Sequence, residues 1–272
     1  MSKITYHPLL VFVLSFSALW LAAWLGAWLR KKGREQDADL RDDFGVILAA
    51  TLTLLALIIG FSFSMATTRY DQRKNYEEQE ANAIGTEYVR ADLLSPVDSA
   101  KVRSLLRSYL DQRILFYTIH DEEELRQISA RTVQLQAELW AAVKAAAAEQ
   151  PTPVVALVIA GMNDVLNSQG YTQAAFWNRI PTAAWGLMMA IAICCNLLFG
   201  YSLRSKARAK LLVVLPIVIS IAFMLVADID TPRHGIVRVS PQNLTSLAES
   251  LRAQQSAWRR AGIARRSARL HL

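Results

Sequence analysis

Apolar runs without a charged side chain occur four times along the chain: Leu9 to Leu29, Phe44 to Thr68, Pro181 to Leu203 and Leu211 to Ala227. A helix needs roughly 20 apolar residues to cross the hydrocarbon of a bilayer. Because lipid offers the backbone no hydrogen-bond partners, such runs form helices rather than loops. The pattern therefore predicts four transmembrane helices, of which the fourth is the shortest and has a kink at Pro216.

The second apolar run passes into charged sequence without a helix breaker. Gly60-Phe61-Ser62-Phe63-Ser64 lies near its end, and Arg69-Tyr70-Asp71-Gln72-Arg73 follows. We therefore expect one helix to leave the bilayer and to continue as a charged helix to about Leu94. A rigid helix with small and hydroxyl side chains near the membrane boundary is suited to lining a pore.

The region between the second and third runs has a helical pattern almost throughout. Ser95-Pro96-Val97-Asp98 predicts a helix start, with serine as the N-cap and proline at the first helical position. A second helix is expected from Asp121 to Glu149. A third follows the break at Pro151-Thr152-Pro153 and is expected from Val154 to Asn167, with its end near Gly170.

These elements predict an all-α membrane protein with four transmembrane helices and a helical extramembrane insert between the second and third. Residues 1–68 would hold the first helix pair, 69–180 the helical region, 181–228 the second pair and 229–272 a basic C-terminal tail. Because the number of spans is even, both termini and the insert lie on one side of the membrane. Basic residues flank the runs on both sides, so charge alone leaves that side open.

The formal net charge of +7 is concentrated in the tail, where six arginines and no acid follow Glu249. Trp258, Ile263 and Leu270 lie among these arginines. The tail is therefore either an amphipathic helix on anionic headgroups or a solvated segment. No nucleic-acid-binding fold accompanies the charge, so we expect the lipid bilayer and no nucleic acid as a partner.

Catalytic chemistry finds no support in the sequence. Cys194 and Cys195 are adjacent in the third run, and neighbouring cysteines rarely form a disulfide. The four histidines, which lie far apart, are His7, His120, His234 and His271. Neither a zinc-ligand spacing nor a phosphate-binding loop is present. We therefore expect no enzyme activity, no metal and no cofactor.

The second run resembles the pore helix of the bestrophin family of anion channels. The shared residues are Gly60-Phe61, Ser64, Arg69-Tyr70 and Arg73-Lys74-Asn75. The order of elements is also similar, with four spans, a helical insert, and a proline-led helix from Pro241 after the fourth span. A likeness to a bacterial bestrophin-like family of unknown function is carried by Gly60 to Met65, Glu80 to Thr86 and Arg90 to Leu94.

The resemblance implies a homo-oligomer, specifically a pentamer, in the cell inner membrane, with the insert and both termini in the cytoplasm and small anions as the permeating species. The implied pore-lining residues are Thr53, Leu57, Phe61 and Ser64. The implied pore-mouth charges are Arg69, Arg73 and Lys74. Thr53 departs from the aliphatic residue usual at its position in the neck. Animal members use a dense acidic cluster for calcium, and only Asp228 and Asp230 follow the fourth span here, so we expect no calcium gating.

Small side chains on the same helix allow another interpretation. They recur at steps of three and four: Ala49, Thr53, Ala56, Gly60, Ser64 and Thr67. Small residues let helices pack closely in lipid, so this small-residue stripe predicts helix packing as well as a pore. The acidic block Tyr76-Glu77-Glu78-Gln79-Glu80 is expected to be a solvated helical face rather than a ring of charges.

Two functions remain open. The first is an oligomeric, anion-permeable channel lined by the second span. The second is a membrane-anchored scaffold or sensor whose insert binds a partner, without transport. A single span would be a sufficient anchor, so four spans favour the channel.

Overall fold

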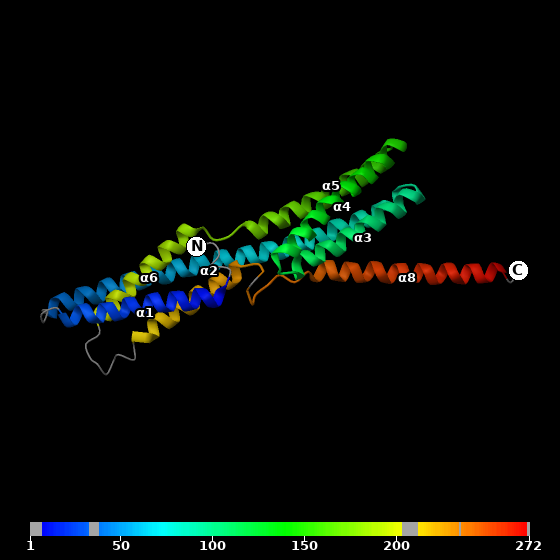
Figure 1. The fold of residues 1–272 in the computed structure, drawn as a ribbon. Helices are drawn as coiled ribbons and strands as arrows, with labels where there is room; N and C mark the ends of the chain where they lie inside the picture. Colours follow the sequence, from blue (N-terminus) through cyan, green and yellow to red (C-terminus); the bar gives the residue numbers. More distant parts are fainter. Residues whose placement is uncertain (1–6, 33–37, 203–211, 234, 271–272) are drawn as a thin grey trace. The chain divides into compact units, whose positions relative to one another are not determined.

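The computed structural model describes residues 7–32, 38–202, 212–233 and 235–270, with only the backbone described for 31–32, 38–43 and 257–270. Its elements in chain order are α1 (Pro8–Lys32), α2 (Ala38–Arg90), the 3₁₀ turn η2 (Ala91–Leu93), α3 (Pro96–Thr118), α4 (Glu122–Glu149), α5 (Pro153–Trp177), α6 (Thr182–Ser202), α7 (Val214–Asp230) and α8 (Gln242–Leu270) (Figure 1). No strand occurs within the described ranges. The predicted all-α fold is confirmed.

The chain forms two compact units. Unit 1 comprises Met1–Asp71 and Asn178–Arg238, and unit 2 comprises Gln72–Trp177 and Val239–Leu272. Helix α2 contributes its first part to unit 1 and its second part to unit 2.

Helix α2 is unbroken from the apolar run into the charged sequence, as predicted. Its 53 residues give a length of about 80 Å at 1.5 Å per residue, far more than the roughly 30 Å of bilayer hydrocarbon. Its long apolar run without a charged side chain extends from Phe44 to Thr68. Residues 44–68, called the membrane half of α2 below, are therefore the part suited to lipid.

Three helical segments of the described chain are long and apolar enough to cross a membrane: Pro8–Arg30, Phe44–Leu93 and Pro153–Ser202. The last contains α6, the predicted third span. Helix α7 has 17 residues and is not among them, so the fourth span stays a prediction. Pro216 lies in the first turn of α7, where a backbone N–H has no helical partner, so it starts this helix rather than kinking it.

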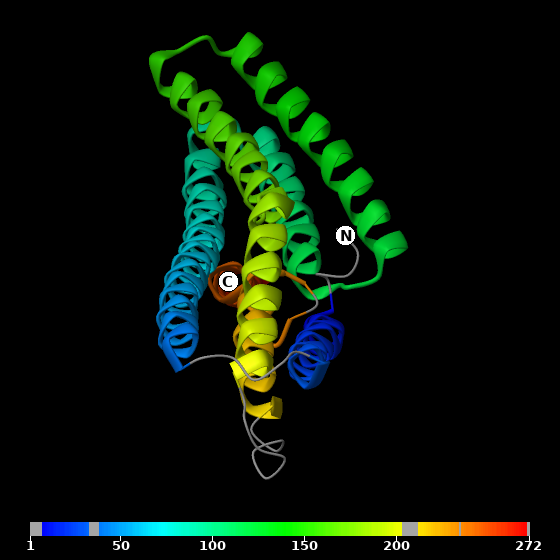
Figure 2. The same ribbon diagram turned by 90° about the vertical axis from the view of Figure 1, so that its left-hand side faces the viewer.

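In unit 1, α1 lies along both α6 and α7, and Figure 2 shows α6 and α7 between α1 and α2. Two glycines let the backbones of α1 and α6 touch. A Cβ on Gly26 would lie 2.1 Å from the Leu197 carbonyl oxygen, and one on Gly200 would lie 1.9 Å from that of Ala23. Only glycine fits at either position without moving a helix.

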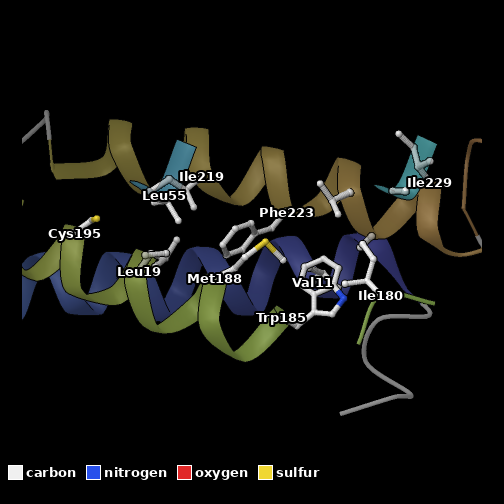
Figure 3. Packing of buried hydrophobic residues seen from close by; sticks show 14 residues of the cluster. Val11, Leu19, Leu55, Ile180, Trp185, Met188, Cys195, Ile219, Phe223 and Ile229 are labelled. Carbon is white, nitrogen blue, oxygen red and sulfur yellow. The ribbon is translucent and has the colours of Figure 1, made fainter. Parts of the chain in front are cut away.

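Large apolar side chains fill the centre of unit 1. Figure 3 shows Phe223 of α7 meeting Met188 of α6, both fully buried. Trp185 packs edge-on against Phe223 with ring centroids 6.2 Å apart. Leu55 is the member of this core that α2 supplies from the centre of its membrane half.

In unit 2, α4 contacts both α3 and α5, and the end of α2 packs beside them. The predicted helix starts are confirmed: Ser95 Oγ accepts a hydrogen bond from the Asp98 N–H of α3, and Asp121 caps α4. The predicted end of α5 near Gly170 is wrong, because the helix continues to Trp177. Burial of Thr172, Ala175 and Phe176 outweighs the modest helix cost of one glycine.

The segment after Val239 is not only a tail. The first three turns of α8 bury Leu244, Ala248 and Leu251 in unit 2, where α8 contacts α3. Side chains of the arginine-rich part beyond Ser256 lie outside the described residues, as do residues 33–37 and 203–211 of the segments between the predicted spans.

Candidate functional site

The membrane half of α2 packs against unit 1 through one narrow face. Leu55, Ser62 and Ala66 are buried on it, with exposed fractions of 2%, 5% and 0%. Leu52, Ile58 and Ile59 are partly buried against the same core. These positions recur every three or four residues, so they form one packed stripe along the helix.

The four predicted pore-lining residues lie on the opposite face. At about 100° per residue, Thr53, Leu57, Phe61 and Ser64 fall within an arc of about 80° that points away from Leu55 and Ala66. All four are exposed, Leu57 by 53% and Phe61 by 64%. The chain therefore gathers these four side chains on one face, and its own described residues do not cover them.

The small-residue stripe does not pack inside this chain. Five of its members are exposed and only Thr67 is partly buried. A Cβ added to Gly60 would meet no described atom within 4 Å. The Thr53 hydroxyl donates to the Ala49 carbonyl at 2.8 Å, so that hydroxyl needs no other acceptor. Helix packing and pore lining, the two interpretations of the stripe, thus both require a helix from another chain.

The three predicted mouth charges lie in different environments. Arg69 is largely buried and pairs with Asp230 at 3.5 Å within unit 1. Arg73 is 1% exposed, and its Nε donates to the Ala175 carbonyl oxygen at 3.1 Å within unit 2. Lys74 is exposed. Of the three, only Lys74 presents its charge at the surface of the described chain.

Buried carboxylates line the packed face of α2 beyond the membrane half. The prediction of a solvated acidic face is wrong for Glu77 and Glu80, which are 1% and 0% exposed. Glu77 accepts hydrogen bonds from the Asn243 side chain at 2.7 Å and from the Leu244 N–H at 2.9 Å. It therefore ties the start of α8 to α2, since these two donors both belong to the first turn of α8.

Glu80 is the acidic partner of a fully buried ion pair. Both of its oxygens face the guanidinium of Arg113 on α3, and the Thr172 hydroxyl of α5 donates to it at 3.1 Å. Arg113 also stacks on Phe116, with 4.4 Å from its Cζ to the ring centroid. Burial, with the nearby Glu80 charge, raises the pKa of Tyr109 and that of Tyr117 far above the ordinary tyrosine value. The cluster joins α2, α3 and α5.

The two acids after α7 hold backbone groups of unit 1. Asp228 accepts the N–H groups of Ile236 at 2.7 Å and Val237 at 2.9 Å, one on each carboxyl oxygen. Asp230 accepts the Ile180 N–H ahead of α6 at 3.1 Å, in addition to Arg69. Among the described residues, no three His, Cys, Asp or Glu side chains gather where a metal could bind.

Sequence reasoning missed this buried polar set, although its spacing was visible. Arg73, Glu77, Glu80, Ile84 and Glu87 continue the three-and-four rhythm of Leu55, Ser62 and Ala66. Counting in the same helical register, the face opposite carries exposed neutral polar side chains. Four of them carry side-chain amides and the last a hydroxyl, and together they are called the amide stripe below: Gln72, Asn75, Gln79, Asn82 and Thr86.

The described residues form an all-helical fold with helices long enough to span a membrane, one span with an uncovered face, and a helical extension that holds a buried ion pair. These features define a helical membrane protein. Residues 17–244 match the family model of the Bestrophin-like domain. The chain belongs to the bestrophin-like family, whose members are embedded in membranes. No match was found among curated proteins.

Solved structures share the fold at low sequence identity. Three of them are single-substitution variants of a bacterial bestrophin homologue from Klebsiella pneumoniae. One has 13% identity and a TM-score of 0.60 and covers 90% of this chain and 97% of its own. A second has 12% identity, a TM-score of 0.61 and coverages of 89% and 96%. The third has 12% identity, a TM-score of 0.59 and coverages of 88% and 97%.

Proposed function

We propose that this chain is a subunit of an oligomeric channel for small anions, in which α2 helices from several copies surround the pore. Thr53, Leu57, Phe61 and Ser64 line it within the membrane. The observation that carries the proposal is the uncovered face of the membrane half of α2. A helix that packs through one narrow stripe, and leaves its opposite face free, is suited to facing an axis shared with other copies.

The side chains on this face suit a narrow gate. Leu57 and Phe61 are large and apolar, and apolar constrictions close a pore by excluding water. Thr53 and Ser64 add hydroxyls, and the Thr53 hydroxyl already donates to its own helix, so the wall carries little exposed polarity. The match to the bestrophin-like family supports a channel rather than an enzyme.

Outside the membrane half, the same face continues as the amide stripe. Lys74 is an exposed cation about 140° around the helix from Phe61, so its charge would attract anions toward the mouth from outside this face. Arg69 and Arg73 are partnered inside the chain, so they take a structural role in the proposal. We place the chain in the cell inner membrane with unit 2 in the cytoplasm, as the family resemblance implies.

Phe61→Ala tests the gate. The wild-type protein and the variant are purified, their oligomeric states are measured, and chloride flux from liposomes is recorded. We expect Phe61→Ala to raise the flux several-fold, because removing the ring widens and wets the constriction. Phe63→Ala is the matched control, since Phe63 is also exposed but lies on another face of the helix.

Three results would contradict the proposal. A monomer could not enclose a conduit made of repeated α2 helices, whatever its flux. Equal flux in the Phe61→Ala and wild-type proteins would remove Phe61 from the gate. An oligomer without flux under all conditions would favour the membrane-anchored scaffold, whose unit 2 would then be the part to use in a search for a partner.

A further inference from the structure

Glu87 is a buried acid that serves none of the contacts described above. Its side chain lies on the packed face of α2 in unit 2 and is 0% exposed. Neither carboxyl oxygen has a hydrogen-bond partner among the described residues. Glu80 and Glu77, about two and three turns earlier on the same face, have two or more donors each. A buried carboxylate without a donor is costly, so the neutral acid is favoured here.

The surroundings of Glu87 are set by Gly161 on α5. A Cβ at Gly161 would lie 2.1 Å from Glu87 Oε2 and 2.5 Å from Arg90 Nη1, so both side chains reach this glycine. Arg90 nevertheless donates to the Leu157 carbonyl oxygen of α5, at 3.4 Å, rather than to Glu87. Asp164 on α5 adds a second negative charge near Glu87. Asp92 of η2 instead forms an ion pair with Arg103.

These charges act on Glu87 in opposite directions. Burial is the largest effect and raises the pKa of Glu87 from 4.5 to about 8; Arg90 lowers it and Asp164 raises it. The proton is therefore bound at neutral pH and leaves under mildly alkaline conditions. The absence of any donor to the carboxyl group agrees with this direction, because a buried carboxylate loses more without a donor than the neutral acid does.

We propose that Glu87 is a proton-binding site, at which loss of the proton draws Arg90 from the Leu157 carbonyl to the Glu87 carboxylate and loosens α5 from α2. The step transfers one proton to solvent. It replaces the Arg90–Leu157 hydrogen bond between α2 and α5 by an Arg90–Glu87 ion pair within α2. The first half of α5 loses a donor that α2 supplied, while the Glu80 and Thr172 contact near its other end remains. This proposal concerns unit 2 alone and does not depend on ion conduction.

The sign of the pH effect follows from the two pKa values. Between about pH 4.5 and 8 the folded protein holds a proton at Glu87 that the unfolded chain has released. The free energy of unfolding therefore falls as the pH rises through this range. Above about pH 8 the loss is complete. Glu87→Gln is neutral and nearly the same shape as the protonated acid, so the variant lacks this pH dependence.

The experiment uses the purified full chain in detergent or nanodiscs. Infrared difference spectra between about pH 6 and pH 9 should show the carbonyl band of a protonated carboxyl group in the wild-type protein, lost at the higher pH, and no such band in Glu87→Gln. Hydrogen exchange of α5 residues 153–167, corrected for the intrinsic rate, should rise about tenfold over this range in the wild type and stay level in Glu87→Gln.

Two variants control the result. Glu78→Gln removes an exposed acid of α2 and should keep the wild-type pH profile. Asp164→Asn should move the wild-type midpoint to lower pH, because it removes a charge that raises the Glu87 pKa. Identical pH profiles for Glu87→Gln and wild type would overturn the proposal. So would a Glu87→Gln protein markedly less stable than wild type at about pH 6, since the ionised carboxylate would then be the native form.

Discussion

Individual side chains of α2 have opposite roles according to the face on which they lie. Glu80 and Glu78 are two residues apart, yet Glu80 is fully buried in an ion pair and Glu78 is exposed. Their residue type is the same, so only helical register separates them. Breaking the Glu80 pair should therefore cost far more than removing an exposed charge.

Arg113→Met tests the energetic role of the buried pair. The change keeps most of the volume of the side chain but leaves Glu80 buried with only the Thr172 hydroxyl as donor. An uncompensated buried charge destabilises a protein by roughly 3 to 5 kcal/mol, so we expect a large fall in the melting temperature of the purified protein. Glu80→Gln in the same protein should restore part of the loss, because it removes that charge.

Arg126→Met is the control for this substitution. Arg126 is 74% exposed and pairs with Glu123 within α4. Surface pairs contribute about 0 to 1 kcal/mol, so this variant should melt close to the wild type. Equal losses in the two variants would show that the Glu80 and Arg113 pair is no more important than a surface pair.

Register also explains which residues the sequence could identify. The resemblance to bestrophins indicated Thr53, Leu57, Phe61 and Ser64, and their helical spacing places them on a common face. Arg73 was assigned to the mouth by its place in a motif, although it lies 12 residues after Phe61 and so about 120° away around the helix. The Arg113 partner of Glu80 could not be predicted, because pairing across helices depends on how α3 packs.

Helix-level contacts depend on glycine where two backbones meet. Gly200→Ala tests the contact of α6 with α1, since its Cβ would lie 1.9 Å from the Ala23 carbonyl oxygen. Backbone atoms cannot yield as a flexible side chain does, so the helices must separate. Overpacking of this kind costs about 1 to 3 kcal/mol, and we expect a lower melting temperature and a smaller yield of folded protein.

Gly186→Ala is the matched control on the same helix. No described atom lies within 4 Å of the Cβ that it adds, and alanine favours a helix over glycine by about 1 kcal/mol. We expect its stability to equal or slightly exceed that of the wild type. If Gly200→Ala behaved in the same way, the close contact of α1 with α6 would not be as the structure has it.

At the level of elements, the sequence predicted where helices begin better than where they end. Ser95 and Asp121 carry their capping chemistry in their own side chains, so the beginnings of α3 and α4 could be located. The end of α5 was placed near Gly170, because glycine is a weak helix former. Burial of Phe176 decides the true end, and burial depends on the tertiary fold.

For the molecule as a whole, the amide stripe of α2 gives a direct test of whether one face lines the path of ions. Gln79 is exposed at its centre, on the side of the helix that also carries Leu57 and Phe61. If α2 helices from several copies surround an axis, each copy places its Gln79 at the same level. A single substitution then adds a ring of charges to the path, so its effect is multiplied by the number of subunits.

Gln79→Lys and Gln79→Glu should therefore shift the reversal potential of reconstituted channels in opposite directions under a salt gradient. Lysine raises the local anion concentration and increases the permeability of chloride relative to potassium. Glutamate lowers both the anion concentration and this relative permeability. The shifts should shrink at high ionic strength, because salt screens a charge within about 10 Å at 0.1 M. Gln127 on α4 is also exposed, so Gln127→Lys and Gln127→Glu supply the matched pair of controls. Shifts of equal size and sign at Gln79 and Gln127 would mean that the effect comes from the overall charge of the protein, and that the amide stripe does not face the ions.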